Sequence, residues 1–150
     1  MTLVSVIIPT YNRRKLLPRA IESTLAQTHR NLEVIVVDDV STDDTLEYLY
    51  GIDDPRLKVL KLEKNGGAGR ARNKGLELAT GSLLAYQDSD DEWSVRFIER
   101  LVAGLNEAGP EVGVIYCGKL VYGRDHQRVF GPGRAAYMPD HDRSIVKGDV

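Results

Sequence analysis

The chain has 150 residues, 42% of them hydrophobic and 28% charged, which predicts one compact globular domain rather than a disordered or membrane-spanning chain. Its formal net charge of −2 provides no basic excess for displacing counterions from a phosphate backbone, so we expect no nucleic-acid partner. The single cysteine, Cys117, excludes an internal disulfide and a multi-cysteine zinc site. The sequence has no signal-peptide pattern and no run of about 18 apolar residues, so we expect a cytoplasmic protein with no transmembrane segment.

The first half of the chain predicts two strands, each followed by a helix. Residues 3–9 form a Val- and Ile-rich run, typical of a strand that is buried on both faces, and residues 32–37 repeat the pattern. Asn12 is the expected N-cap of the first helix, and Ser41 or Thr42 that of the second. The apolar residues at helical spacing are Leu16, Leu17, Ala20, Ile21, Thr24 and Leu25, then Leu46 and Leu49.

The second half continues the alternation. A third strand, residues 57–62, leads into a glycine-rich loop, and the helix that follows is expected to end at Gly81. A fourth strand, residues 82–87, runs into an acidic cluster. A helix over residues 94–108 and a fifth strand over residues 112–117 complete the pattern.

Strands that alternate with helices predict βαβ units with right-handed crossovers. The expected fold is therefore α/β, a three-layer α/β/α sandwich around a mostly parallel central sheet. We assign residues 1–122 to this core and residues 123–150, where no periodicity persists, to a loop-rich segment. Because the carboxyl ends of parallel strands open onto the same edge of a sheet, the polar clusters after the strands should converge on one crevice.

The acidic cluster Asp88-Ser89-Asp90-Asp91 follows the fourth strand. Asp88 and Asp90 flank one residue, so both carboxylates can face a single Mg²⁺ or Mn²⁺, ions that prefer oxygen ligands and often share them with substrate phosphates. An acidic turn that caps the next helix is the alternative interpretation.

Other strand ends carry groups suited to a nucleotide. Asp38 and Asp39 could accept hydrogen bonds from a base or a ribose, and Tyr11 offers a flat face for stacking; a helix cap and core packing are the respective alternatives. The loop over residues 65–69 lets backbone approach a ligand, with Arg70, Arg72 and Lys74 close by, although a solvated surface loop would have the same composition. Neither a dinucleotide-binding nor a P-loop glycine pattern is present.

Four motifs, taken together, resemble those of family 2 glycosyltransferases of the GT-A fold from residue 3 to about residue 117. They are Val4-Ser5-Val6-Ile7-Ile8-Pro9-Thr10-Tyr11-Asn12, Val36-Val37-Asp38-Asp39-Val40-Ser41-Thr42-Asp43, Asn65-Gly66-Gly67 with Ala71-Arg72-Asn73, and Asp88-Ser89-Asp90-Asp91-Glu92-Trp93. The resemblance implies a nucleotide-diphosphate-sugar donor, most commonly a UDP-sugar, a divalent metal, Mn²⁺ or Mg²⁺, and transfer to an acceptor hydroxyl with inversion. It also implies polysaccharide biosynthesis with a carbohydrate or lipid-linked acceptor, in the cytoplasm or peripheral to the membrane; a homo-oligomer is compatible with it.

Carried over by position, the resemblance implies a role for each matching residue. Asp38 would contact the base. The nucleotide-sugar site would comprise Pro9, Thr10, Tyr11, Asp38, Asp39, Gly67, Arg72, Asn73, Asp88 and Ser89. The metal site would comprise Asp88, Asp90 and Asp91.

Two departures from the family pattern stand out. Family members usually continue into an acceptor-binding region with a later acidic motif that carries the general base, so residues 123–150 would be the incomplete start of that region and the base is not identified. Asp140, Asp142 and Asp149 match no family position. Val40 stands where the family commonly has Gly, and a left-handed backbone would be strained in Val.

Three other functions are alternatives to this interpretation. A non-catalytic module of the same fold would bind the nucleotide-sugar without transferring it. A sugar-phosphate nucleotidyltransferase would need a Gly-rich, basic loop after the first strand, which Pro9-Thr10-Tyr11-Asn12 does not provide. A phosphoacceptor receiver domain would need a Thr or Ser and a Lys at later strand ends.

Overall fold

The computed structural model describes residues 2–117, 119–122, 127–130 and 144–145, with side chains up to residue 117. The chain forms two compact units, residues 1–96 and residues 97–150, each with its own elements. His126, Asp140, His141, Asp142 and Asp149 lie outside the described residues. Among the described residues, no helix combines the length and the apolar character that crossing a membrane requires.

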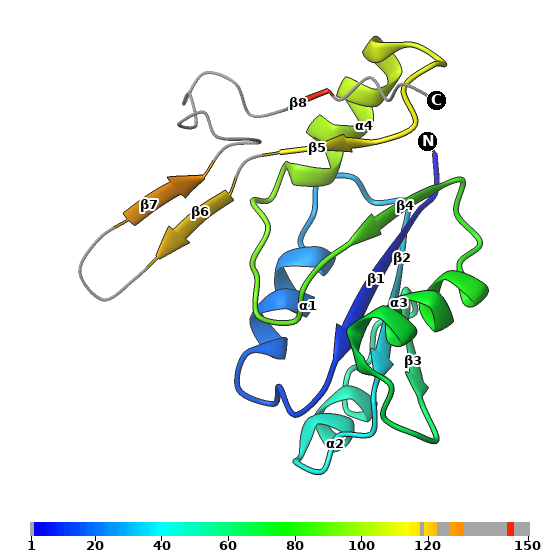
Figure 1. Cartoon of the computed structure of the whole chain (residues 1–150), viewed down its shortest axis with the longest axis vertical. Helices are drawn as coiled ribbons and strands as arrows, with labels where there is room; N and C mark the ends of the chain where they lie inside the picture. The colour runs from blue at the N-terminus through cyan, green and yellow to red at the C-terminus, as the bar shows by residue number, and fades with distance from the viewer. Residues whose placement is uncertain (1, 118, 123–126, 131–143, 146–150) are drawn as a thin grey trace. The chain divides into compact units, whose positions relative to one another are not determined.

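The first unit is built on a four-stranded sheet in the order β3-β2-β1-β4, with every pair parallel (Figure 1). The strands are β1 (Val4–Thr10), β2 (Leu32–Asp38), β3 (Leu57–Lys61) and β4 (Leu83–Tyr86). Every residue of β1 and β2 is buried, as expected for the two central strands of a sheet that is covered on both faces. The continuous Val and Ile runs therefore occupy the centre of the sheet.

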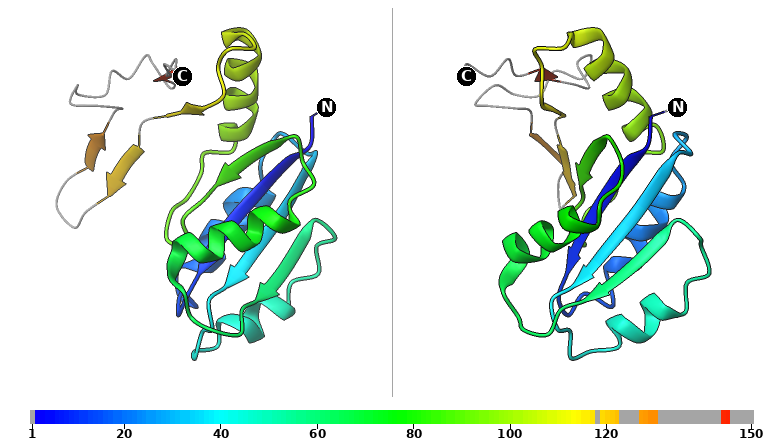
Figure 2. Two further views of the ribbon diagram at one scale, coloured as in Figure 1. Left: turned by 45° about the vertical axis from the view of Figure 1, so that its right-hand side comes forward. Right: turned by 90° about the vertical axis from the view of Figure 1, so that its right-hand side faces the viewer.

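Helices cover both faces of this sheet. Figure 2 shows α3 (Gly67–Leu78) on one face, and α1 (Leu17–Leu25) and α2 (Thr45–Tyr50) on the other. The contact of α3 with the sheet is close at Gly75, where an added Cβ would lie 2.5 Å from Cγ2 of Ile7. The predicted three-layer α/β/α arrangement with a mostly parallel sheet is confirmed.

The helix ends differ from the sequence prediction because loops supply the caps. α1 begins at Leu17, with a proline in its first turn and no side-chain cap, rather than after Asn12. The Asn12 side chain instead accepts hydrogen bonds from the backbone N–H groups of Thr42 (2.7 Å) and Asp43 (3.4 Å). In return, Ser41 Oγ accepts the N–H of Asn12 (2.9 Å), so the loops after β1 and β2 are tied together.

The start of α2 and the end of α3 also differ from the sequence prediction. α2 has Asp44 as its N-cap residue, and the Asp43 carboxylate accepts the backbone N–H of Thr45 (3.1 Å), so neither Ser41 nor Thr42 caps this helix. α3 ends at Leu78, before Gly81. The backbone N–H of Gly81 donates to Ser5 Oγ (2.8 Å), which attaches this turn to β1.

The second unit contains α4 (Phe97–Ala108) and two antiparallel strand pairs. β5 (Ile115–Tyr116) pairs with β8 (Ser144–Ile145), and β6 (Lys119–Tyr122) pairs with β7 (Gln127–Phe130). The predicted fifth strand over residues 112–117 is thus shorter than expected and is not part of the parallel sheet. β7 lies in the segment expected to be loop-rich, while a division of the chain after residue 122 stays a prediction.

Candidate functional site

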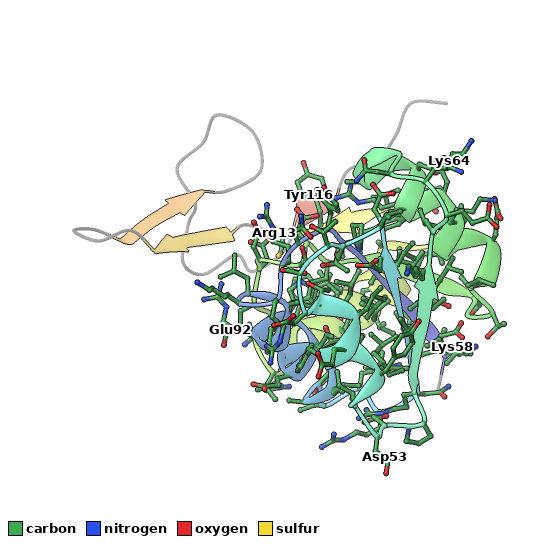
Figure 3. All side chains as sticks on the ribbon, turned by 90° about the horizontal axis from the view of Figure 1, so that it is seen from below. Arg13, Asp53, Lys58, Lys64, Glu92 and Tyr116 are labelled. Carbon is green, nitrogen blue, oxygen red and sulfur yellow. The ribbon has the colours of Figure 1, made fainter. Side chains whose placement is uncertain are left out.

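A pocket of about 560 Å³ lies at the carboxyl-end edge of the parallel sheet, entirely within the first unit. It is lined by Pro9, Thr10, Tyr11, Asn12, Arg13, Asp39, Asn65, Gly67, Ala68, Ala71, Arg72, Asp88, Ser89 and Asp90. Figure 3 views the molecule from below and labels Arg13 of this pocket, with Lys58 on the right of the view. The expected convergence of distant polar segments on one crevice is what the fold produces.

The end of β1 contributes an aromatic ring and a buried hydroxyl. Tyr11 is 47% exposed, so its ring is available to a ligand rather than packed in the core. Thr10 is 3% exposed, and its Oγ1 has no hydrogen-bond partner among the described residues. Because buried polar atoms in folded proteins are nearly always bonded, an orphaned hydroxyl in a pocket wall is suited to meeting a ligand or a water molecule.

Of the two acids at the end of β2, Asp39 rather than Asp38 lines the pocket. Asp38 is fully buried, its Oδ2 accepts the N–H of Ser41 (2.9 Å), and its Oδ1 has no hydrogen-bond partner among the described residues. The Asp39 carboxylate accepts the N–H groups of Gly66 (2.9 Å) and Gly67 (2.7 Å). Adjacent side chains on an extended backbone point in opposite directions, which explains why Asp38 is absent from the pocket lining. The expectation that Asp38 contacts the base stays a prediction.

The glycine loop and the start of α3 form the next part of the wall. Gly67 has φ +80°, a conformation that Gly adopts without strain, and it lines the pocket together with Arg72. Asn73, which was expected beside the ligand, is exposed and is not among the lining residues. Successive residues on a helix are about 100° apart, so a helix that turns Arg72 to the pocket turns Asn73 away.

Val40 adopts the left-handed conformation that the sequence comparison with the family anticipates for this position. Its φ is 68°, which is strained for a β-branched residue. The side chain is half-buried and packs against a core cluster that includes Val37, Leu62 and Ala71. This packing offsets part of the strain of the left-handed conformation.

The acidic cluster after β4 places Asp88, Ser89 and Asp90 in the pocket wall. Asp88 Oδ1 forms an ion pair with Arg72 Nη2 (2.5 Å) across the pocket. Asp91 does not line the pocket; its backbone N–H donates to the carbonyl of Asp88 (3.1 Å) and closes the turn. α4 begins at Phe97, later than the expected start at residue 94, and the alternative interpretation of the cluster as a helix cap stays open.

The donor set fits a divalent cation that is completed by a substrate. Within the part of the chain that the structure describes, no group of three or more His, Cys, Asp or Glu side chains could hold a metal. Two carboxylates, Asp88 and Asp90, nevertheless share the pocket wall. Mg²⁺ and Mn²⁺ are typically bound by one or two carboxylates plus substrate phosphates and water, so this pair matches that chemistry.

Sequence reasoning did not single out three of the lining residues for the site. They are Asn12, Arg13 and Ala71. Asn12 and Ala71 lie inside the motifs that carry the family resemblance, whereas Arg13 directly follows the first motif and carries no pattern of its own. Its position two residues after Tyr11, close to a strand end, is the signal that could have identified Arg13.

Comparisons with known proteins show the family and the fold of the chain. A family model described as Glycosyl transferase family 2 matches residues 5–145. The putative teichuronic acid biosynthesis glycosyltransferase TuaG of Bacillus subtilis is 47% identical over 107 residues, which cover 70% of the chain and 42% of that protein.

Two solved structures are also similar. S. aureus TarS 1-349 in complex with UDP-GlcNAc has a TM-score of 0.66 and 38% identity, covering 70% of the chain and 31% of that structure. The mannosyltransferase PcManGT from Pyrobaculum calidifontis, in complex with GDP-Man and Mn²⁺, has a TM-score of 0.68 and 31% identity, covering 75% and 34%. The chain spans less than half the length of each of these three proteins.

Proposed function

The chain belongs to glycosyl transferase family 2, and on that premise we propose that it binds a nucleotide-diphosphate sugar as the donor part of an inverting glycosyltransferase. The observation that carries the proposal is that one pocket at the strand ends is lined by Tyr11, Asp39, Arg72, Asp88 and Asp90. An aromatic face suits a nucleobase, a guanidinium suits phosphate, and paired carboxylates suit a divalent cation. A UDP-sugar is the first donor to test, because the similar TarS structure is a complex with UDP-GlcNAc.

We assign the nucleoside to the side of the pocket formed by β1 and β2. Tyr11 stacks on the base, and Asp39 faces the base or ribose, where its carboxylate can accept a hydrogen bond in addition to those from the glycine loop. The unpartnered Thr10 hydroxyl provides a further polar contact. The Asp38 carboxylate accepts the backbone N–H of Ser41 and so stabilises the loop that follows Asp39.

Asp88 and Asp90 are the proposed ligands for Mn²⁺ or Mg²⁺. When bound, the cation neutralises negative charge that grows on the departing nucleoside diphosphate. Arg72 balances the charge of Asp88 in the ligand-free pocket through their ion pair. Its guanidinium lies in the wall that would hold the diphosphate, so the same residue provides a second positive charge there.

Transfer with inversion also needs a general base within about 2.6–3.2 Å of the acceptor hydroxyl. No described residue is assigned this role, and a carbohydrate or lipid-linked acceptor would be recognised outside the pocket described above. Donor binding is therefore proposed for this chain, and sugar transfer for a longer protein that contains it. A module that binds the donor without transferring it is the alternative; a transfer assay on the chain and on a longer version separates the two.

Donor binding is tested by calorimetric titration of the chain with UDP, GDP and dTDP, each with and without Mn²⁺. We expect one of the three to bind with micromolar to millimolar affinity, and Mn²⁺ to strengthen that binding. Uridine, guanosine and thymidine are the controls, because a nucleoside lacks the diphosphate through which the cation acts. No binding of any nucleotide in either condition would contradict the proposal.

Replacing Tyr11 by Ala is expected to weaken nucleotide binding about 5- to 150-fold, because base stacking on an aromatic side chain contributes about 1–3 kcal/mol. Tyr11→Phe keeps the ring and should bind almost as well as the wild type. Tyr50→Ala is the matched control, since Tyr50 is 67% exposed on α2 and does not line the pocket. Equal affinities of Tyr11→Ala and Tyr50→Ala would exclude Tyr11 as the stacking residue.

A further inference from the structure

α1 carries a polar stripe in addition to its buried apolar face. Arg19, Ser23 and Gln27 recur at four-residue intervals, so they lie on one side of the helix and its C-terminal extension. Each contacts the segment of residues 87–95, which we call the acidic loop. Arg19 Nη2 donates to the carbonyl of Asp90 (2.7 Å), Gln27 Nε2 donates to the carbonyl of Ser94 (2.7 Å), and Ser23 Oγ accepts the N–H of Trp93 (3.2 Å).

Gln87, the residue directly before Asp88, is hydrogen-bonded to α1. Its side chain is 1% exposed, and its Nε2 donates to Ser23 Oγ (3.2 Å) and to the carbonyl of Asp91 (3.3 Å). Its Oε1 accepts the hydroxyl of Thr24, which is fully buried on α1. The amide of Gln87 thus joins the start of the acidic loop, its turn and the helix.

The contact between α1 and the acidic loop is polar, which indicates that it does more than fill space in the core. Burying the amides of Gln27 and Gln87 is unfavourable unless every group is bonded, and apolar side chains would fill the same space at lower cost. Fully satisfied polar networks select one arrangement of the groups they join. Here the network joins Gln87, which directly precedes Asp88, to the backbone carbonyls of Asp90 and Asp91. It therefore holds the backbone that carries the two proposed metal ligands, Asp88 and Asp90.

We propose that the polar stripe of α1, formed by Arg19, Ser23 and Gln27, acts together with Thr24 and Gln87 to hold Asp88 and Asp90 in the geometry that binds a divalent cation. The inference rests on the proposed function of the acidic cluster as a metal site, and it explains what holds Asp88 and Asp90 in position. The stripe residues are positioning residues, because they act on the cation through the acidic loop. Partners of this kind, one step removed from a metal ligand, typically change metal affinity about 10- to 100-fold when they are lost.

Ser23→Ala is the first test, and Ser5→Ala is its matched control. Like Ser23, Ser5 accepts a backbone N–H through its hydroxyl, that of Gly81 (2.8 Å), but Ser5 is fully buried and lies at the amino-terminal end of the sheet. Affinity for Mn²⁺ alone is measured by electron paramagnetic resonance, and affinity for UDP by calorimetry with and without Mn²⁺. Thermal unfolding shows how far each substitution destabilises the protein.

We expect Ser23→Ala to weaken Mn²⁺ binding about 10-fold and to reduce the gain in UDP affinity from Mn²⁺, with metal-free UDP binding unchanged. Ser5→Ala should lower the melting temperature and leave the gain intact. Arg19→Gln is a second variant that should fold normally, since Arg19 is 53% exposed, and it should reduce the same gain.

Equal Mn²⁺ affinities in Ser23→Ala, Arg19→Gln and Ser5→Ala would overturn the positioning role and leave the proposed metal site standing. If Mn²⁺ provides no gain in the wild type, the metal assignment itself fails, and the positioning role fails with it.

Discussion

Asp90→Asn is expected to abolish the gain in UDP affinity that Mn²⁺ provides while leaving metal-free binding close to that of the wild type. Asp90 and Asp88 are the two carboxylates of the acidic cluster in the pocket wall, and the amide of Asn is a neutral and weaker ligand for a hard cation. In a longer version of the protein that transfers sugar, the same change should lower the rate about 10²- to 10³-fold. That range is the typical cost of removing one group that stabilises developing negative charge.

Asp91→Asn is the matched control for this prediction. The substitution is the same, one residue further along the same turn, but Asp91 does not line the pocket. Calorimetry with UDP at saturating and at zero Mn²⁺ gives the gain for each variant. If Mn²⁺ still strengthens UDP binding in Asp90→Asn but not in Asp91→Asn, Asp91 is a metal ligand, as expected from the sequence, and Asp90 is not.

The sequence predicts the location of the site because parallel strands share one carboxyl-end edge. Tyr11, Asp39 and Asp88 are far apart in the chain, yet each lies just beyond the carboxyl end of a parallel strand, and each lines the same pocket. The buried strands themselves are predicted well, because Val- and Ile-rich runs that lie between two helix layers carry a strong signal.

The sequence cannot show which of two neighbouring residues faces the pocket. Asp38 and Asp39, like Arg72 and Asn73, differ by one position, and the choice depends on the rotation of a single strand end or helix. A resemblance transfers a motif as a whole, so it assigns roles to both members of such a pair. Only coordinates separate them.

The sequence does not predict the helix ends or the length and pairing of the fifth strand correctly, because the residues that determine them are distant in sequence. Asn12 has the composition of an N-cap, but it bonds to the turn before α2, a segment about 30 residues away. Residues 112–117 have the apolar content of a central strand, although only β5 forms, and its partner is antiparallel. The polar stripe of α1 is likewise meaningful only once the acidic loop is known to pack beside it.

Glu33→Gln is expected to lower the free energy of unfolding by about 3 kcal/mol at pH 7. The carboxylate is 6% exposed near the amino-terminal end of β2. Burial alone would raise the pKa of Glu33, but Lys58 Nζ (2.7 Å), Ser5 Oγ (2.5 Å) and the backbone N–H of Thr80 (2.6 Å) outweigh it and lower that pKa from 4.5 to about 2. A shift of this size corresponds to about 3 kcal/mol of preference for the ionised form in the folded state.

The pH dependence of unfolding provides a second measure of the same interaction. Because the pKa is lower in the folded than in the unfolded state, the contribution of Glu33 is complete above about pH 4.5 and is lost as the pH falls toward 2. Urea unfolding of wild type and Glu33→Gln should therefore differ by about 3 kcal/mol at pH 7 and converge near pH 2.

Glu77→Gln is the control, because Glu77 also pairs with a lysine at 2.7 Å but is 60% exposed, and it should change stability by less than about 1 kcal/mol. A constant difference between Glu33→Gln and the wild type from pH 7 to 2 would mean that the loss comes from packing rather than from charge.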